Sequence, residues 1–248
     1  MKTALVTGTS KGIGLEFAKQ YAALGWRVVA TYRGSPTEAL ERLNQSAENV
    51  NLIDVNIANL NEIDQVAEAL GETQIDALIS NAGMMGRGGG PEAQVGEHIG
   101  TLDYDLFDEY MAINVRAPAK LIEALLGNLK RSENGKAIVI SSGAGSFGMP
   151  ATLPGNYWYK ASKAALNMVM RNVANDLRPA GVTVLMFHPG LVLTERLAPM
   201  REKILKMSGQ EKPFETVEAV ANMIATIDRA GLEDSGRFVR NDGSEMPW

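Results

Sequence analysis

The sequence contains no cysteine and only two histidines, His98 and His188. The lack of cysteine excludes disulfides and thiolate chemistry. A structural zinc site needs several cysteine or histidine ligands, and neither histidine has a second histidine or a carboxylate cluster at metal-ligand spacing. Both histidines are therefore interpreted as ordinary polar residues, and no resident metal is expected.

Long apolar runs are also missing. The first apolar stretch ends at Gly8, which is too early for a signal peptide. No run approaches the roughly 18 apolar residues that a membrane span requires. The sequence therefore predicts a cytoplasmic protein with no membrane partner.

Basic residues do not dominate the chain: 24 Lys and Arg stand against 29 Asp and Glu, for a net charge of −5. Without a basic run, nothing indicates a nucleic-acid partner. With 45% hydrophobic and 21% charged residues in 248, the composition is that of a globular protein with one substantial core.

Short apolar runs alternate with helical patterns from the first residues onward. The runs are continuous rather than alternating, as expected for strands covered on both faces. They lie at residues 5–6, 28–29, 52–53, 77–79, 137–140 and 182–187. This order predicts a Rossmann-type α/β fold, with a doubly wound parallel sheet of about seven strands between two helical layers, in a single domain over residues 1–248.

Helix boundaries are marked by local signals. Ile13, Phe17, Tyr21 and Leu24 share one helix face, and Gly25 follows as a stop. The segment 35–38 reads as a capping box with proline at the first helical position. Asn59 with Glu62 predicts another helix start, which Gly71 closes.

Three segments interrupt the alternation of strand and helix. Residues 84–103 are rich in glycine, and residues 143–156 are rich in small residues. Residues 195–214 are amphipathic and predict a mobile lid. Together these segments are expected to form the walls of a substrate pocket beyond the carboxyl ends of the strands.

A glycine-rich turn, Thr7–Gly14, lies between the first strand and the first helix. Its spacing is GxxxGxG, and its position predicts a site where backbone N–H groups and a helix N-terminus meet a pyrophosphate. A purely structural turn is the alternative. The residues expected to contact the cofactor are Gly8, Ser10, Lys11, Gly12, Ile13 and Gly14.

The second strand ends in Arg33, where NAD-binding folds usually place an acid that binds the ribose. The planar fork of an arginine suits a 2′-phosphate, and Lys11 adds a second positive charge. Both side chains could instead be solvated surface charges. The absence of the acid and the presence of two bases predict NADP(H) in preference to NAD(H).

Several motifs follow in a fixed order. They are the Thr7–Gly14 turn, Asp54-Val55, Asn81-Ala82-Gly83, Asn114, Ser141-Ser142, Tyr159 to Lys163, and Pro189-Gly190 with Thr194. In this order and at element ends, the chain resembles the short-chain dehydrogenase/reductase family over nearly its whole length. The continuation into residues 164–168 and the end in Pro247-Trp248 make it similar to the branch of C-factor and sniffer-type carbonyl reductases.

Tyr159 and Lys163 are four residues apart and so share a helix face. A nearby ammonium favours the phenolate of a tyrosine, which can then exchange a proton with a substrate oxygen. The alternative is a packed tyrosine and a surface lysine. The resemblance implies Tyr159 as general acid/base, and Lys163 as its partner that also binds the nicotinamide ribose.

The resemblance implies two further catalytic residues. Ser142 would orient the substrate oxygen, with Ser141 as the fallback, because Ser142 lies 17 positions before Tyr159 rather than the usual 13 or so. Asn114 would hold a water that links Lys163 to solvent, unless it merely interrupts a helix before Pro118.

The resemblance also assigns further cofactor contacts. Asp54 and Val55 would meet the adenine. Asn81, Ala82 and Gly83 would lie on the adenosine side. Pro189, Gly190, Val192 and Thr194 would surround the nicotinamide.

The sequence as a whole thus predicts an NADP(H)-dependent oxidoreductase acting on a small carbonyl or alcohol. Reduction and oxidation both remain open. A nucleotide-binding signalling or scaffold protein with the same fold is the alternative. A homodimer or homotetramer is implied by many members of the family, whereas the sniffer-like branch includes monomers.

Overall fold

The computed structural model describes residues 1–86, 98–149, 155–195, 197, 202 and 213–248. Its centre is a sheet of seven parallel strands in the order β3-β2-β1-β4-β5-β6-β9. The strands are β1 (Thr3–Thr7), β2 (Arg27–Tyr32), β3 (Val50–Asp54), β4 (Ala77–Ser80), β5 (Lys136–Ile140), β6 (Thr183–His188) and β9 (Phe238–Arg240). The predicted strand number and fold class are confirmed.

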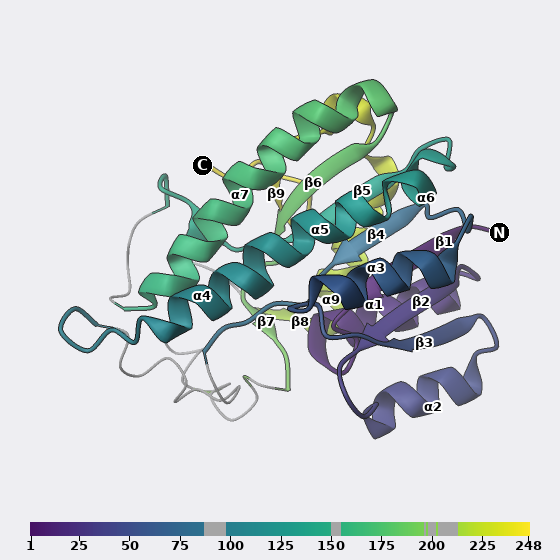
Figure 1. Cartoon of the computed structure of the whole chain (residues 1–248), viewed down its shortest axis with the longest axis horizontal. Coiled ribbons are helices and arrows are strands. Elements are labelled where there is room, and N and C mark those ends of the chain that lie inside the picture. Colours follow the sequence, from purple (N-terminus) through teal and green to yellow (C-terminus); the bar gives the residue numbers. More distant parts are fainter. Residues whose placement is uncertain (87–97, 150–154, 196, 198–201, 203–212) are drawn as a thin grey trace.

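Helices cover both faces of the sheet (Figure 1). One face carries α3 (Leu60–Leu70), α5 (Ala117–Ala124) and α7 (Tyr157–Leu177), and the other carries α1 (Gly12–Ala23), α2 (Glu38–Ser46) and α9 (Thr216–Arg229). Two shorter helices, α4 (Asp105–Met111) and α6 (Leu126–Lys130), flank α5 in the chain.

The pleat of the strands divides the core between these two layers. Leu5 and Leu78 pack with the helices of one face, and their chain neighbours Val6 and Ile79 pack with those of the other. All four side chains are fully buried. This two-sided burial explains why the strands read as continuous apolar runs in the sequence.

Two helix-end details differ from the sequence-based expectation. Helix α2 is capped by Thr37, whose hydroxyl accepts from Leu40 N at 3.4 Å, so the predicted start at residues 35–36 is wrong. Thr37 Oγ1 also donates to Ser10 O at 2.7 Å, and this tertiary bond selects the later cap. Leu24 is 60% exposed and lies past the end of α1, outside its buried face. The predicted start of α3 at Asn59 and stop at Gly71 are confirmed.

The order of strands reverses between β1 and β4, where connections run outward in opposite directions. In open parallel sheets the ligand crevice lies outside the carboxyl ends of the strands at such a point. A small two-stranded sheet of β7 (Val192–Leu193) and β8 (Phe214–Glu215) adjoins this edge. Most of the predicted lid lies outside the described residues.

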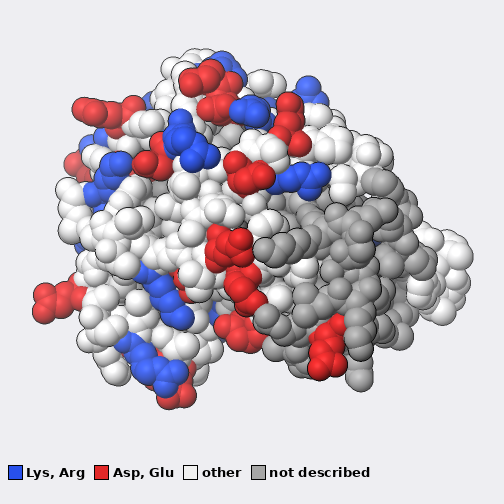
Figure 2. Space-filling model, turned by 180° about the vertical axis from the view of Figure 1, so that it is seen from behind, with Lys and Arg blue, Asp and Glu red and all other residues white. Residues whose placement is uncertain are grey.

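On the described part of the face seen in Figure 2, acidic and basic side chains both occur, and a few acidic ones lie next to one another near its centre. Among the described residues, no helix combines the length and the apolar character needed to cross a membrane.

Candidate active site

The Thr7–Gly14 turn is closely packed at its glycine positions, which leave little room for a side chain. Gly8 and Gly12 have φ angles of 72° and 60°, in the left-handed region that favours glycine. A Cβ on Gly14 would lie 2.3 Å from Gly8 O. Helix α1 begins at Gly12 behind the extended residue Lys11, which provides no side-chain cap. The first N–H groups of α1 therefore face the turn without a side-chain acceptor, as an anion site requires.

Replacing Gly14 by Ala is expected to lower the free energy of unfolding by about 1–3 kcal/mol, because the new methyl group meets a backbone carbonyl. Binding of NADPH should weaken with it. Gly127→Ala is the matched control, since Gly127 lies in α6 with no atom within 4 Å of its added Cβ. Chemical denaturation should show equal or higher stability for the control. A Gly14→Ala protein as stable as the control would contradict this packing.

Two positive side chains flank the turn. Lys11 and Arg33 are both exposed, and neither forms an ion pair with any residue that the structure describes. Thr9 N donates to Thr31 O at 2.9 Å, which keeps the ends of β1 and β2 together. The nearby Asp54 carboxylate instead accepts from Gly34 N at 2.8 Å.

The segment after β4 is built into the glycine turn. Thr7 Oγ1 accepts from both Asn81 N and Ala82 N at 3.0 Å. The Asn81 side-chain amide donates to Thr7 O at 2.9 Å and to Gly8 O at 3.3 Å. The side-chain amide of Asn81 thus braces the turn, and its predicted cofactor contact would come from other atoms of the residue.

Lys163 lies at the centre of the site on α7. Its ammonium donates to Ile140 O at 2.9 Å and lies 5.8 Å from the centre of the Tyr159 ring. The side chain is buried, and burial lowers the pKa of Lys163 to about 8. A Cβ on Gly83 would be 3.8 Å from Lys163 Nζ, so Gly83 lies beside the Lys163 ammonium.

Asn114 occupies a π-helical turn, Ala112–Arg116, between α4 and α5. Its side chain accepts from Met84 N at 2.7 Å and donates to Met84 O at 2.9 Å and to Ser162 Oγ at 3.0 Å. Turns of this kind are frequent at functional sites. The Asn114 side chain therefore ties the segment after β4 to α7.

The two serines after β5 have different surroundings. Ser141 is buried, and its hydroxyl donates to Asn167 Oδ1 at 2.5 Å. Ser142 is partly exposed, and its oxygen accepts from Ala144 N at 3.1 Å. That bond uses an oxygen lone pair and leaves the hydroxyl proton of Ser142 to be donated.

The segment after β6 reaches back over the glycine turn. Gly190 has a φ of 81°, and Pro189 O accepts from Asn241 Nδ2 at 2.9 Å. Val192 is buried in β7, and the Thr194 methyl group lies 3.3 Å from where a Cβ on Gly12 would stand. Thr194 therefore reaches the start of α1.

Sequence reasoning missed several residues that hold this site. The Tyr110 hydroxyl accepts from Gly86 N at 2.6 Å, and its ring lies 6.3 Å from that of Tyr159. Ser162 Oγ donates to Tyr159 O at 2.8 Å while it accepts from Asn114. Ser162 stands inside the Tyr159–Lys163 motif and could have been singled out there. Tyr110 had no local signal, because its partners are distant in the sequence.

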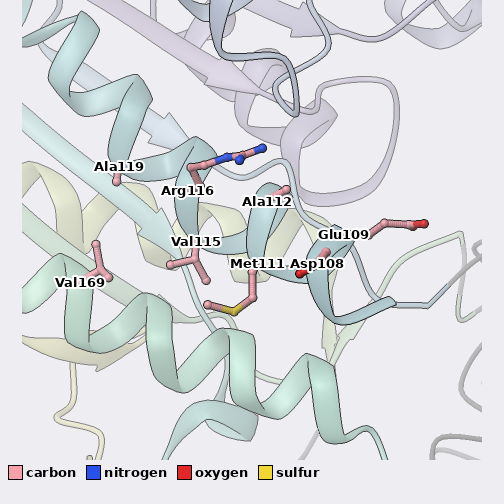
Figure 3. Close-up of a pocket in the computed structure, with 8 residues that line it drawn as sticks. All are labelled: Asp108, Glu109, Met111, Ala112, Val115, Arg116, Ala119 and Val169. Carbon is pink, nitrogen blue, oxygen red and sulfur yellow. The ribbon is translucent and has the colours of Figure 1, made fainter. Parts of the chain in front are cut away.

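A cavity of about 610 Å³ lies between the helices α4 and α5 and helix α7. Met111 at the end of α4 and Val115 in the π-helical turn project toward α7 (Figure 3). Its other lining residues are Asp108, Glu109, Ala112, Arg116, Ala119 and Val169. No predicted site residue lines this cavity.

Two sequence relatives match the chain over most of its length. The 1-hydroxy-2-glutathionyl-2-methyl-3-butene dehydrogenase of Rhodococcus sp. (strain AD45) is 31% identical over 252 residues, covering all of both chains. The C-signal protein of Myxococcus xanthus is 32% identical over 174 residues, covering 70% of this chain and 93% of its own.

Solved structures agree with the fold over the whole chain. The NADPH-bound carbonyl reductase from chicken fatty liver has a TM-score of 0.83 and 27% identity, covering 100% of this chain and 99% of its own. A carbonyl reductase from Pseudomonas aeruginosa PAO1 in complex with NADP has a TM-score of 0.81 and 30% identity, covering 100% of both chains. The sniffer carbonyl reductase of D. melanogaster has a TM-score of 0.81 and 25% identity, with the same coverage. The sequence model of the short chain dehydrogenase family matches residues 2–205 of this chain. The chain therefore belongs to the short-chain dehydrogenase family of oxidoreductases.

Proposed function

We propose that this protein is an NADP(H)-dependent reductase of small carbonyl compounds. The observation that carries the proposal is the buried Lys163 ammonium beside the Tyr159 ring, at the carboxyl edge of the sheet. The Ser142 hydroxyl lies at the same edge, directly after β5. Burial of an amine destabilises the fold, and groups whose pKa is shifted in this way cluster at functional sites.

The residues present fit a dinucleotide. The Lys163 ammonium has three N–H donors, and one backbone carbonyl is its acceptor among the described residues. Ribose hydroxyls would satisfy the remaining donors. The glycine turn and the start of α1 would receive the pyrophosphate, and Lys11 with Arg33 would receive a 2′-phosphate.

When bound, the nicotinamide would supply the hydride. Ser142 would donate a hydrogen bond to the substrate oxygen, and Tyr159 would transfer its phenolic proton to that oxygen. The positive charge of Lys163 would stabilise the phenolate that remains. Because the Asn114 side chain is already bonded to Met84 and Ser162, a water-mediated proton relay at this residue would use its backbone carbonyl.

NADP(H) is favoured by Lys11 and Arg33, which form no ion pair with the described residues, and by the solved structures that are similar to this chain. The chicken fatty liver carbonyl reductase is bound to NADPH, and the Pseudomonas aeruginosa enzyme to NADP. The carbonyl reductase names of these structures favour reduction over oxidation of the alcohol.

The test is oxidation of NADPH or NADH at 340 nm over a panel of aldehydes, ketones and quinones. We expect NADPH to be consumed with at least one class of carbonyl compound. Binding of NADPH without turnover of any member would favour the alternative of a signalling protein. That alternative is supported by the C-signal relative from Myxococcus xanthus.

Replacing Arg33 by Ser should raise the KM for NADPH about 10- to 100-fold and leave the KM for NADH nearly unchanged, because only NADPH carries the 2′-phosphate. Arg27→Ser is the matched control, since Arg27 is also exposed but stands at the opposite end of β2. Steady-state kinetics with both cofactors measures the ratio. An equal loss for NADPH and NADH would show that Arg33 does not read the phosphate.

The assembly state of the protein is determined by a separate experiment. The family resemblance leaves a homodimer, a homotetramer and a monomer open, and light scattering after gel filtration distinguishes them.

A further inference from the structure

We propose that His188 is a positioning residue for Ser142: its imidazole holds the turn on which the Ser142 hydroxyl is presented. The proposal rests on the function above and adds a residue that the sequence assigned no role. His188 is the last residue of β6, and Gly143 N donates to its Nδ1 at 3.1 Å.

The turn after Ser142 is a single 3-10 turn, Gly143–Gly145. Its inner hydrogen bonds come from Ala144 N to Ser142 Oγ at 3.1 Å and from Gly145 N to Ser142 O at 3.0 Å. These local bonds shape the turn but do not fix it relative to the sheet. The bond from Gly143 N to His188 links the turn to a neighbouring strand.

Backbone pairing ends where this side-chain bond begins. Ser141 N donates to Phe187 O at 2.8 Å; Ser141 follows the last residue of β5, and Phe187 is the last β6 residue that pairs with β5. Two residues after Ser141, Gly143 N is met by the His188 ring rather than by a backbone carbonyl. The imidazole thus extends the β5–β6 connection past the end of the sheet to the residue after Ser142.

The opposite side of the turn is packed against α7. A Cβ on Gly145 would lie 2.6 Å from the backbone carbonyl carbon of Lys163, so the turn touches the helix of the catalytic pair. Asn167 Nδ2 also donates to Gly145 O at 3.5 Å, a long bond. The turn after Ser142 therefore contacts both α7 and His188, and its bond to His188 is shorter than its bond from Asn167.

The geometry also specifies which atom of His188 is used. Nδ1 accepts the hydrogen bond from the Gly143 N–H group. The turn requires a hydrogen-bond acceptor at the position of Nδ1, the ring atom that is bonded to Cγ. Asparagine offers its Oδ1 at that place, glutamine offers an acceptor one atom farther out, and leucine offers none.

If His188 acts through Ser142, its loss should lower kcat more than it raises the KM of either substrate. The Ser142 hydroxyl is expected to meet the substrate oxygen where negative charge develops, and such contacts lose their effect with small displacements. We expect His188→Leu and His188→Gln to lower kcat about tenfold with the best carbonyl substrate, while His188→Asn retains most of it.

The decisive experiment places His188→Leu, His188→Gln and His188→Asn in both the native and the Ser142→Ala backgrounds. Fluorescence titration with NADPH and thermal unfolding confirm that each variant is folded and binds cofactor. We expect the losses in kcat from His188→Leu and His188→Gln to disappear in the Ser142→Ala background, because that background has no Ser142 hydroxyl to displace.

Equal losses in both backgrounds, or no difference between the Asn and Gln variants, would overturn the proposal. If Leu does not fold, the comparison of Asn with Gln still decides, because both are polar and differ only in where the acceptor stands. Failure of the proposed function is a separate outcome, in which the native protein itself turns over no carbonyl compound.

Discussion

The Tyr159→Phe protein is expected to bind NADPH with nearly native affinity and to lose about 10²- to 10⁴-fold in kcat, the range of one acid–base group. The substitution removes the phenolic oxygen and keeps the ring, which packs 6.3 Å from the ring of Tyr110. With no proton donor at this position, transfer of a hydride to the carbonyl would leave an unprotonated oxygen. Single-turnover NADPH oxidation measures the chemical step directly.

Tyr157→Phe is the matched control for this prediction. Tyr157 lies on the same helix and is 41% exposed, and the residue four positions later is Ala161 rather than a lysine. Its variant should retain nearly native kcat. Comparable activity of the Tyr159→Phe and native proteins would remove Tyr159 from the proton transfer and with it the proposed mechanism.

The second large effect concerns stability and its dependence on pH. Burial lowers the pKa of Lys163 to about 8, below the value of 10.5 that lysine has in an unfolded chain. Between these values the unfolded chain holds a proton that the folded one has released, so this lysine makes stability rise with pH. Below pH 8 both states are charged, and the full destabilisation of the folded state is present.

Lys163→Met should abolish turnover and remove this pH-dependent contribution. The free energy of unfolding of the variant, relative to the native protein, should fall by on the order of 3 kcal/mol between pH 7 and pH 10.5. Loss of the donor to Ile140 O opposes the gain at all pH values by about 1–3 kcal/mol. The change with pH, rather than the value at one pH, therefore carries the prediction.

This prediction is checked by urea unfolding between pH 7 and pH 10.5. The proteins compared are the native protein, Lys163→Met and Lys130→Met. Lys130 is exposed at the last turn of α6, so its variant should follow the native pH profile. A Lys163→Met profile parallel to the native one would mean that Lys163 has an ordinary pKa and is not held in a desolvated site.

Most of the fold was predictable because local patterns and burial agree. Six of the sheet strands appear as apolar runs, and Asn59 and Gly71 bound α3 as expected. The seventh strand, Phe238–Arg240, has only three residues and was not located. The strands β7 and β8 have two residues each, too short for any period to be visible.

The errors at helix ends have a common cause. A capping pattern in the sequence does not show which residue the tertiary structure will use, and residues 35–38 were interpreted as a capping box with proline at the first helical position. The bond from Thr37 to Ser10 O joins α2 to the glycine turn and decides for Thr37. Leu24 continued the apolar spacing of α1, but the helix ended before it.

The sequence alone determined the family, the order of the motifs and the i,i+4 relation of Tyr159 and Lys163, because these depend on residue type and on spacing along one chain. Only the tertiary structure decided that Ser141 is bonded to Asn167 while Ser142 remains partly exposed, and that the Asn114 side chain holds Met84 and Ser162. It alone brought His188 to Gly143. These partners lie 26 to 48 residues apart along the chain. The parallel sheet brings the ends of its strands together, and no local pattern in the sequence records which side chains will meet there.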